Sequence, residues 1–509
     1  MKYLFKENNF ENKKDKIIEI YIRLLKENNN KSKKIMLLVP NNITKLQYDR
    51  KINIGFSEEI KITTYLNFIK KELIKFWPIV LENCNQINKK LISPIFIPNS
   101  LSEYIIKNKV NEKRNIEGYF QDITSTNRNI ANSINININK AALALIDFKT
   151  IGEKIYLSKK NRDNIMKFSY SQMNEIIDYY IDLLLSNSMI DNSISIYLYN
   201  EYLLKNDLYL ENLKNDTDYL IVDSLEACSN AEIDFIDLIS DYARDTYIYF
   251  NNTRDYSVFN NIDMEYINKK IIEKFNKEAN YNNLNNLKES ITRNILIEDI
   301  YLLPTKINLN ESSQLYSEMI DQATNKVISL INEGTSPSDI AIISPINNTV
   351  LDYQVSNILN NNNIEVFNTK KDKKIIDYPY ANALVIASCI FYGYKDYIKE
   401  EEYISFIEII LNVNRIQAFK IFRNKEESEE YKELEKYIAL KKENDIKISE
   451  FLIQFYIDKM LNLKEGRVNV GICKQIIYES EAFTENVSLL GLDKNKDKEK
   501  IFIEALKTT

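Results

Sequence analysis

Apolar residues near the start of the chain alternate between strand-like and helix-like spacing. Residues 35–39 (Ile-Met-Leu-Leu-Val) form a short continuous apolar run closed by Pro40, which is typical of a buried parallel strand. Apolar residues between 17 and 25 recur at helical spacing and predict one face of a helix. Further strands are expected at 2–5 and 61–64, and a further helix at 65–76. This alternation predicts a parallel α/β sheet.

The pattern changes between residues 86 and 215. Long helical patterns cover 173–185 and 194–204, which indicates a mainly helical insertion. Ile134, Ile136 and Ile138 alternate with asparagines, and this period of two predicts a strand within the insertion.

The α/β pattern then returns and is followed by more helices. Tyr219–Val222 is an apolar run that ends at Asp223, and it predicts another buried strand. The later elements expected are helices at 233–239, 315–331, 351–359, 383–391, 403–411, 416–422 and 451–461, and strands at 246–250, 340–343 and 364–367.

These patterns divide the chain into two α/β domains, each carrying a helical appendage. The first α/β domain is expected in two parts, 1–85 and 216–265, around the insertion at 86–215. The second is expected at 266–380, with a helical insertion at 381–509. No repeat of fixed period is visible.

Composition excludes several chemistries. The 509 residues include no histidine, which removes Ser-His-Asp catalysis and histidine-ligated metal sites. There are 8 glycines, none before Gly55 and none followed by lysine, so a GxxxxGK[ST] phosphate-binding loop is absent. The four cysteines are scattered, as expected for buried reduced thiols. The first 16 residues contain no apolar core of signal-peptide length, and no apolar run is long enough to span a membrane, so a cytoplasmic protein without a membrane span is expected.

The segment between the first expected strand and helix occupies the position of a phosphate-binding loop. Its sequence, KENNFENKKDK from Lys6 to Lys16, has no glycine to point backbone amides at a phosphate. Lys13 or Lys14 could still place positive charge at the helix start. The alternative is a solvated basic turn.

Asp223, at the end of an apolar strand, is the second candidate. A carboxylate in this position can hold Mg²⁺ in nucleotide hydrolysis, with a following glutamate to orient water. Here Ser224 follows, and Glu226 comes two residues later. The alternative is that Asp223 or Ser224 caps a helix.

The order and spacing of these segments resemble those of the UvrD/Rep-type superfamily-one DNA helicases. The resemblance covers nearly the whole chain, and its individual motifs are degenerate. The segments that carry it are LVPNNITKLQYDR (38–50), KITTYLNFIKKEL (61–73), YLIVDSLEACSNAEIDFIDLI (219–239), YIYFNNTRDYSVF (247–259) and, best of all, 319–367.

The resemblance implies two RecA-like domains of the P-loop NTPase type that bind ATP and Mg²⁺. It places Asp223 at the metal and catalytic site, Lys13 or Lys14 at the phosphate, and Arg293 near the γ-phosphate. Ser224 replaces the catalytic glutamate, so ATP binding and hydrolysis are expected to be impaired or lost. The late family motifs TxHxxKGLE and VAxTRA are not found, so the second sheet is expected to be incomplete and open to a protein partner.

Single-stranded DNA is the partner that the resemblance implies, through Asn41, Thr64, Tyr65 and Phe68. Aromatic stacking on Tyr65 and Phe68 would supply much of the affinity. The alternative is that these rings pack in the interior. The expected function is a UvrD-like DNA helicase homologue of repair or recombination with degenerate ATPase motifs. The alternative is a non-catalytic helicase-fold scaffold, similar to the inactive half of AddB-type subunits, that binds DNA or a partner protein.

Overall fold

A computed structural model describes most of the chain. The described residues are 1–7, 10–27, 34–52, 60–89, 91–251, 262–275, 278–281, 313–344, 348–368, 374–442, 446–463, 465–494 and 496–508. They form two compact units, one of residues 1–286 with 383–509 and one of residues 287–382. Each unit is described by itself.

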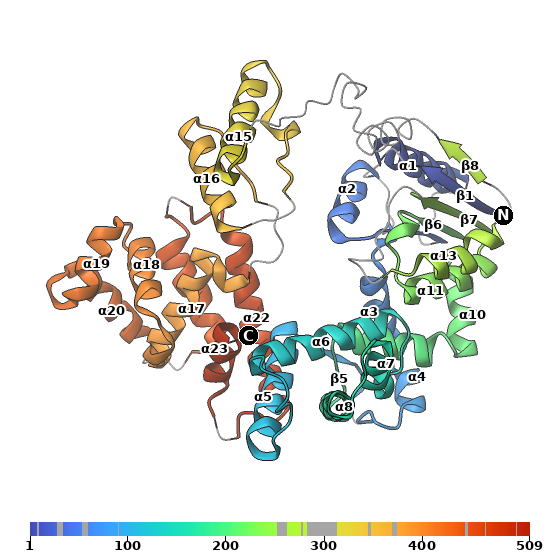
Figure 1. The fold of residues 1–509 in the computed structure, drawn as a ribbon, viewed down its shortest axis with the longest axis horizontal. Coiled ribbons are helices and arrows are strands. Elements are labelled where there is room, and N and C mark those ends of the chain that lie inside the picture. The colour runs from blue at the N-terminus through green and yellow to red at the C-terminus, as the bar shows by residue number, and fades with distance from the viewer. Residues whose placement is uncertain are drawn as a thin grey trace. The chain divides into compact units, whose positions relative to one another are not determined.

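A parallel sheet organises the N-terminal part of the larger unit (Figure 1). Its strand order is β3-β2-β6-β7-β1-β8. Every neighbouring pair is parallel, which confirms the predicted α/β class. The strands are β1 (Lys2–Glu7), β2 (Ile35–Leu38), β3 (Ile62–Thr63), β6 (Tyr219–Val222), β7 (Asp245–Phe250) and β8 (Glu278–Tyr281).

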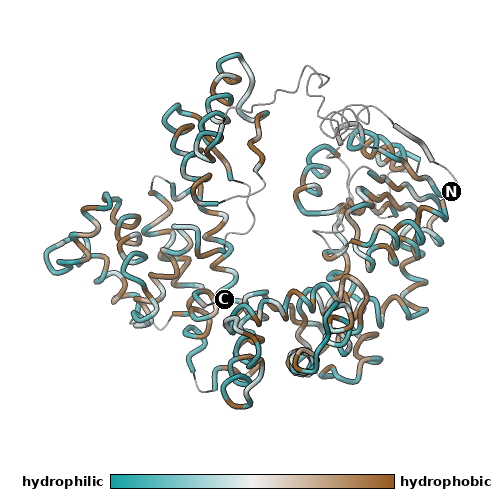
Figure 2. Tube along the Cα trace, viewed as in Figure 1, coloured by the Kyte–Doolittle hydropathy of each residue, from teal (hydrophilic) through white to brown (hydrophobic). Residues whose placement is uncertain are grey.

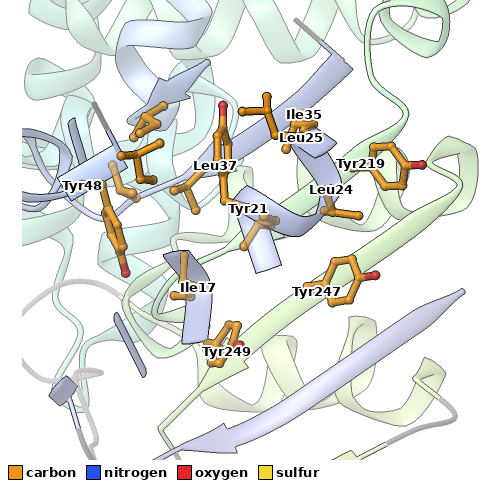
Figure 3. Close-up of a cluster of buried hydrophobic side chains, with 14 residues drawn as sticks. Ile17, Tyr21, Leu24, Leu25, Ile35, Leu37, Tyr48, Tyr219, Tyr247 and Tyr249 are labelled. Atoms are coloured by element: carbon orange, nitrogen blue, oxygen red, sulfur yellow. The ribbon is translucent and has the colours of Figure 1, made fainter. Parts of the chain in front are cut away.

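Two helices cover one face of this sheet. Figure 3 shows side chains from α1 (Phe10–Glu27) and α2 (Asn42–Ile52) packed over residues of β2, β6 and β7. The 3.6-residue period predicted a buried face of Ile17, Ile18, Tyr21, Leu24 and Leu25. Four of these residues are buried, and Ile18 is partly buried against them. Helix α11 (Asn230–Tyr242) lies on the other side of the sheet (Figure 1).

The region 86–215 is mainly helical, as predicted. The expected helix at 173–185 is the C-terminal half of α8, and the expected helix at 194–204 falls on α9 and a π-helical turn. The elements around and within this region are α3 (Tyr65–Lys75), α4 (Trp77–Asn83), β4 (Ile95–Phe96), α5 (Asn99–Glu117), α6 (Asn127–Leu143), a 3₁₀ turn (Phe148–Thr150), α7 (Ile151–Ser158), α8 (Asn164–Ser186), β5 (Met189–Ile190), α9 (Asn192–Leu198), the π-helical turn (Tyr199–Leu203) and α10 (Asp207–Asn215).

The strand predicted from Ile134, Ile136 and Ile138 is wrong, because these residues belong to α6. Ile134 and Ile138 are four residues apart and therefore share the buried helical face, whereas Ile136 is 54% exposed. Thr126 caps the helix by accepting a hydrogen bond from the backbone N–H of Asn129. A short alternation fits both periods, and here packing against the neighbouring helices favours the helix.

The C-terminal part of the larger unit is helical, as predicted. Along its helices, hydrophobic and hydrophilic residues alternate around the axis (Figure 2). In the described ranges no helix combines the length and the apolar character that a membrane crossing needs. The helices are α17 (Pro379–Tyr392, whose first turn belongs to the smaller unit), α18 (Glu400–Ile410), α19 (Arg415–Arg423), α20 (Glu429–Lys442), α21 (Ile448–Phe455) with a π-helical turn (Tyr456–Met460), α22 (Val470–Leu489) and α23 (Lys498–Thr508).

In the smaller unit the predicted helices are confirmed and the predicted strands are wrong. Helices α15 (Tyr316–Asn332) and α16 (Thr349–Asn361) pack on a core that contains Ile320 and Val355. Residues 340–343 and 364–367 form no ladder in the described part of this unit. Ile340, Ile364 and Val366 pack on the helices instead, and Ile343 is 92% exposed. Two short segments without further neighbours do not make a stable parallel sheet.

Candidate functional site

The carboxyl edge of the sheet brings Lys13 and Asp223 together. Lys13 lies near the start of α1, and Asp223 follows β6 directly. The Lys13 Nζ atom is 2.6 Å from Asp223 Oδ1, and the two side chains are 6% and 0% exposed. Ligands of open parallel sheets bind outside this edge, so the pair occupies the position where a ligand would be expected.

Ser224 and Tyr48 complete the hydrogen bonding of this pair. Lys13 Nζ donates to Ser224 Oγ at 2.6 Å, and Ser224 Oγ donates to Asp223 Oδ1 at 3.0 Å. Tyr48 OH donates to the other carboxylate oxygen, Oδ2, at 3.0 Å. Burial, together with the negative charge of Asp223, raises the pKa of Tyr48, so the phenol stays protonated as a donor. We call these four residues the Lys13 cluster.

The turn after β6 sets the position of Ser224. Its φ of 63° lies in the left-handed region, which is uncommon for a residue other than glycine. A 3₁₀ turn (Leu225–Ala227) follows, and Ser224 makes no side-chain cap on it. The helix-capping alternative for Asp223 and Ser224 is wrong, because Ser229 and Glu232 form the capping box of α11.

Glu226 ties the same turn to the end of β7. Its Oε2 atom accepts a hydrogen bond from the backbone N–H of Asn251 at 3.0 Å, and the residue is 2% exposed. Burial raises the pKa of this carboxyl, and the nearby Lys13 charge opposes that rise. Glu226 therefore has a structural partner in the backbone of Asn251.

The residues present do not fit Mg²⁺ or a nucleotide phosphate. Mg²⁺ is held by open carboxylate oxygens and retains several waters, whereas both oxygens of Asp223 already accept hydrogen bonds inside the protein. Lys13 is committed to Asp223 and Ser224. We therefore derive no catalytic step through ATP or a metal ion.

Lys14, another predicted nucleotide contact, has a partner outside the Lys13 cluster. Lys14 Nζ donates to the side-chain oxygen of Gln47 on α2. Burial and the neighbouring Lys51 lower the pKa of Lys14. Arg293 lies outside the described residues.

Two of the predicted DNA contacts are helix caps. Asn41 Oδ1 accepts a hydrogen bond from the backbone N–H of Thr44 at 2.9 Å at the start of α2. Thr64 Oγ1 accepts one from the backbone N–H of Asn67 at 3.3 Å at the start of α3. Their positions at strand ends follow from the sequence, and their local roles are those of ordinary N-caps.

Tyr65 and Phe68 are not available for base stacking in this structure. Each is 4% exposed, and both rings pack against Tyr199 and Phe235 at centroid distances of 5.1–6.2 Å. The expectation that they form a stacking platform is therefore corrected: the alternative, interior packing, holds. The two rings are three residues apart on one face of α3, which packs against the π-helical turn of the insertion and against α11.

Sequence reasoning missed Tyr48 as a member of the Lys13 cluster. Its spacing from Thr44 and Ile52 marks one buried face of α2, and all three residues are buried. That signal predicts burial but does not identify Asp223 as the partner, because the contact joins distant parts of the chain.

The described residues contain no group of three or more His, Cys, Asp or Glu side chains that could hold a metal ion. The four cysteines, Cys84, Cys228, Cys389 and Cys473, are free and buried, as expected. No protein-family model matches this chain, and no curated protein matches it either.

Proposed function

We propose that this protein is a UvrD/Rep-like helicase homologue of DNA repair or recombination that acts as a scaffold without ATP turnover. The proposal includes a RecA-like character for the first α/β domain, whose parallel sheet supports it, and single-stranded DNA as the partner. The order of segments along the chain supports the family assignment. The buried Lys13–Asp223 ion pair is the observation that carries the loss of ATP turnover.

A nucleotide would have to break this pair in order to use either residue. Separating two buried charges leaves each without its partner, at a cost of about 3–5 kcal/mol when one partner is lost. The phosphates would have to recover that energy from the glycine-free segment 6–16. The expected loop there is wrong, because residues 6 and 7 belong to β1 and residues 10–16 belong to α1. Ser224 also supplies a hydroxyl where hydrolysis needs a carboxylate.

DNA binding would depend on polar groups at the starts of α2 and α3. Asn67 Nδ2 donates to Asn42 Oδ1 at 2.9 Å, which joins the two helix starts. Because Tyr65 and Phe68 are buried, stacking on these rings would contribute nothing. Weak binding without sequence preference is the expectation.

A second candidate is an active ATP-dependent DNA helicase. The observation that favours it is the meeting of a lysine and a strand-end aspartate at the carboxyl edge of a parallel sheet, where phosphate and metal would both be needed. In that case the ion pair would open when nucleotide binds.

Calorimetric titration with ATP and Mg²⁺, with and without oligo(dT), distinguishes the two candidates. The scaffold predicts no ATP binding at millimolar concentration and no DNA-stimulated phosphate release. Ser224→Glu should not restore turnover, because the connection between β1 and α1 still lacks glycine. Turnover of ordinary helicase size would overturn the scaffold proposal. Failure to bind a fluorescent oligonucleotide would leave a protein partner as the scaffold's ligand.

A further inference from the structure

Helices α7 and α8 form an antiparallel hairpin, joined by residues 159–163 (Figure 1). Near the base of this hairpin, the backbone N–H of Gly152 donates to Asn174 Oδ1 at 2.7 Å. A Cβ atom at Gly152 would lie 2.2 Å from the carbonyl oxygen of Tyr170, so only glycine lets the two helices approach this closely. The base of the hairpin is therefore fixed, and we call residues 154–168 its tip.

Hydrogen bonds also hold the turn at the tip. The Arg162 guanidinium donates to the backbone carbonyl oxygens of Leu157 and Lys159. Asp163 caps α8 by accepting a hydrogen bond from the backbone N–H of Met166 at 2.6 Å. The backbone of the tip is therefore held by contacts among its own residues.

The buried face of α8 continues into the tip, where the described residues do not cover it. Ile165 lies four residues before Ser169, and Phe168 lies four residues before Gln172, so each pair shares a face of the helix. Ser169 and Gln172 are buried, whereas Ile165 and Phe168 are each 65% exposed. Leu157, at the end of α7, is 49% exposed. Three large apolar side chains of one hairpin tip are thus in contact with water.

The same tip is strongly basic, although the whole chain has a net charge of −6. It contains five basic residues and one acidic residue, Asp163. Its four lysines are exposed, and within the described part of the chain none of them takes part in an ion pair. The basic residues are Lys154, Lys159, Lys160, Arg162 and Lys167. The charge of these lysines can therefore attract an anionic partner.

The apolar and the basic side chains together select the partner. A single-stranded nucleic acid would pair with the lysines and stack on Phe168, but it would leave the aliphatic side chains of Leu157 and Ile165 in water. An anionic lipid surface uses both sets of groups. Its headgroups attract lysines, and the boundary between headgroups and acyl chains takes up protruding apolar side chains.

We propose that the tip of the α7–α8 hairpin binds the surface of an anionic membrane. Leu157, Ile165 and Phe168 enter the boundary between headgroups and acyl chains, and the lysines lie at the headgroups. This binding is peripheral and does not depend on the proposed function.

Flotation of the full chain with lipid vesicles tests the proposal. The chain should float with vesicles that contain phosphatidylglycerol and not with vesicles of phosphatidylcholine alone. Added salt should weaken the binding, because it screens the attraction between lysines and headgroups. Ile165→Ser should weaken the binding about five-fold or more, since it removes an inserted apolar side chain. Ile416→Ser, at a residue of α19 that is 71% exposed, is the matched control and should bind like wild type.

Removal of charge tests the basic half of the surface. Lys159→Ala combined with Lys160→Ala should weaken vesicle binding about ten-fold or more, because each lysine near an anionic surface contributes about five-fold. The double variant Lys420→Ala with Lys436→Ala removes the same charge from exposed positions on α19 and α20 and should bind nearly like wild type. Circular dichroism confirms that the helices of each variant remain folded.

Each outcome supports the proposal or overturns it. Absence of flotation, equal flotation with both kinds of vesicle, or tip variants that bind like their controls would each overturn it. If the full chain binds oligo(dT) and the tip variants lose only that binding, the tip is a nucleic-acid surface and the membrane proposal is wrong. Vesicle binding that the tip variants lose supports the proposal whether or not an oligonucleotide binds, so its test is separate from that of the proposed function.

Discussion

The side chains of Lys13 and Asp223 form a buried ion pair, 2.6 Å between Nζ and Oδ1, at the carboxyl edge of the sheet. Together with Ser224 and Tyr48, the pair satisfies both carboxylate oxygens from within the protein. A site that would be open and hydrated in a nucleotide hydrolase is closed here by its own residues. The stability of the first domain and the proposed loss of ATP turnover therefore depend on the same contacts.

Lys13→Met should lower the free energy of unfolding by about 3–5 kcal/mol, because Asp223 would be buried without its cation. Urea denaturation followed by circular dichroism measures this. Lys14→Met is the matched control, since Lys14 is a neighbouring lysine outside the ion pair, and its effect should be much smaller.

The double variant Lys13→Met with Asp223→Asn should be more stable than Lys13→Met alone. The neutral amide removes the uncompensated charge and can still accept the Tyr48 hydrogen bond. Strictly additive losses would contradict an energetic coupling between the two residues.

Two substitutions at Ser224 separate the contribution of its hydrogen bonds to stability from the cost of its left-handed backbone. Ser224→Ala loses the hydroxyl and keeps the left-handed backbone, so it should destabilise by about 1–2 kcal/mol. Ser224→Gly loses the same hydroxyl but relieves the strain, so it should be more stable than Ser224→Ala. Thermal denaturation of the three proteins gives the order. A glycine variant less stable than the alanine variant would exclude strain at this turn.

Tyr65→Ala should lower the stability of the folded protein, because Tyr65 packs in the interior and is not expected to contact DNA. The ring is 4% exposed and packs on Phe235, so its removal should cost about 3–5 kcal/mol. Tyr65→Phe keeps the ring and loses the hydroxyl, which accepts from Asn200 Nδ2 at 3.1 Å and donates to Asn200 Oδ1 at 3.4 Å, at a cost of about 1 kcal/mol. Oligonucleotide affinity of Tyr65→Phe should equal that of wild type. A large loss of affinity would place the hydroxyl at the DNA.

Glu226→Gln should stabilise the protein at pH 7 more than at pH 4. Burial raises the folded-state pKa of Glu226 above its unfolded value, so the folded protein binds this proton more readily. The contribution of Glu226 to stability therefore falls as the pH rises from its unfolded-state pKa through its folded-state pKa. Above that range the buried carboxylate is charged and its full cost is present. Glutamine removes the cost and still accepts from Asn251.

Urea denaturation at the two pH values, compared with Glu211→Gln at an exposed position, measures the difference. A gain from Glu226→Gln that is equal at both pH values, or no gain at pH 7, would contradict this assignment of the pKa shift.

Local periodicity accounts for the predictions that succeeded. The buried faces of α1 and the continuous apolar runs of β2 and β6 are each determined within a few residues. The same reasoning failed at Ile134–Ile138, where a short alternation suits a helix as well as a strand. It also failed at 340–343 and 364–367, because a strand requires a neighbour that no local pattern supplies.

The sequence by itself indicated that Lys13 and Asp223 would both lie near the carboxyl edge of one parallel sheet. It also excluded a glycine-rich phosphate-binding loop at that edge. Only the tertiary structure decided that the lysine would bond to the aspartate, that Tyr48 would occupy the second oxygen, and that Tyr65 and Phe68 would face the interior. The physical reason is that helical spacing defines which side chains are buried but not what they touch. Contacts between α1, α2 and β6 depend on how distant segments pack, and that packing turned the expected nucleotide site into a closed ion pair.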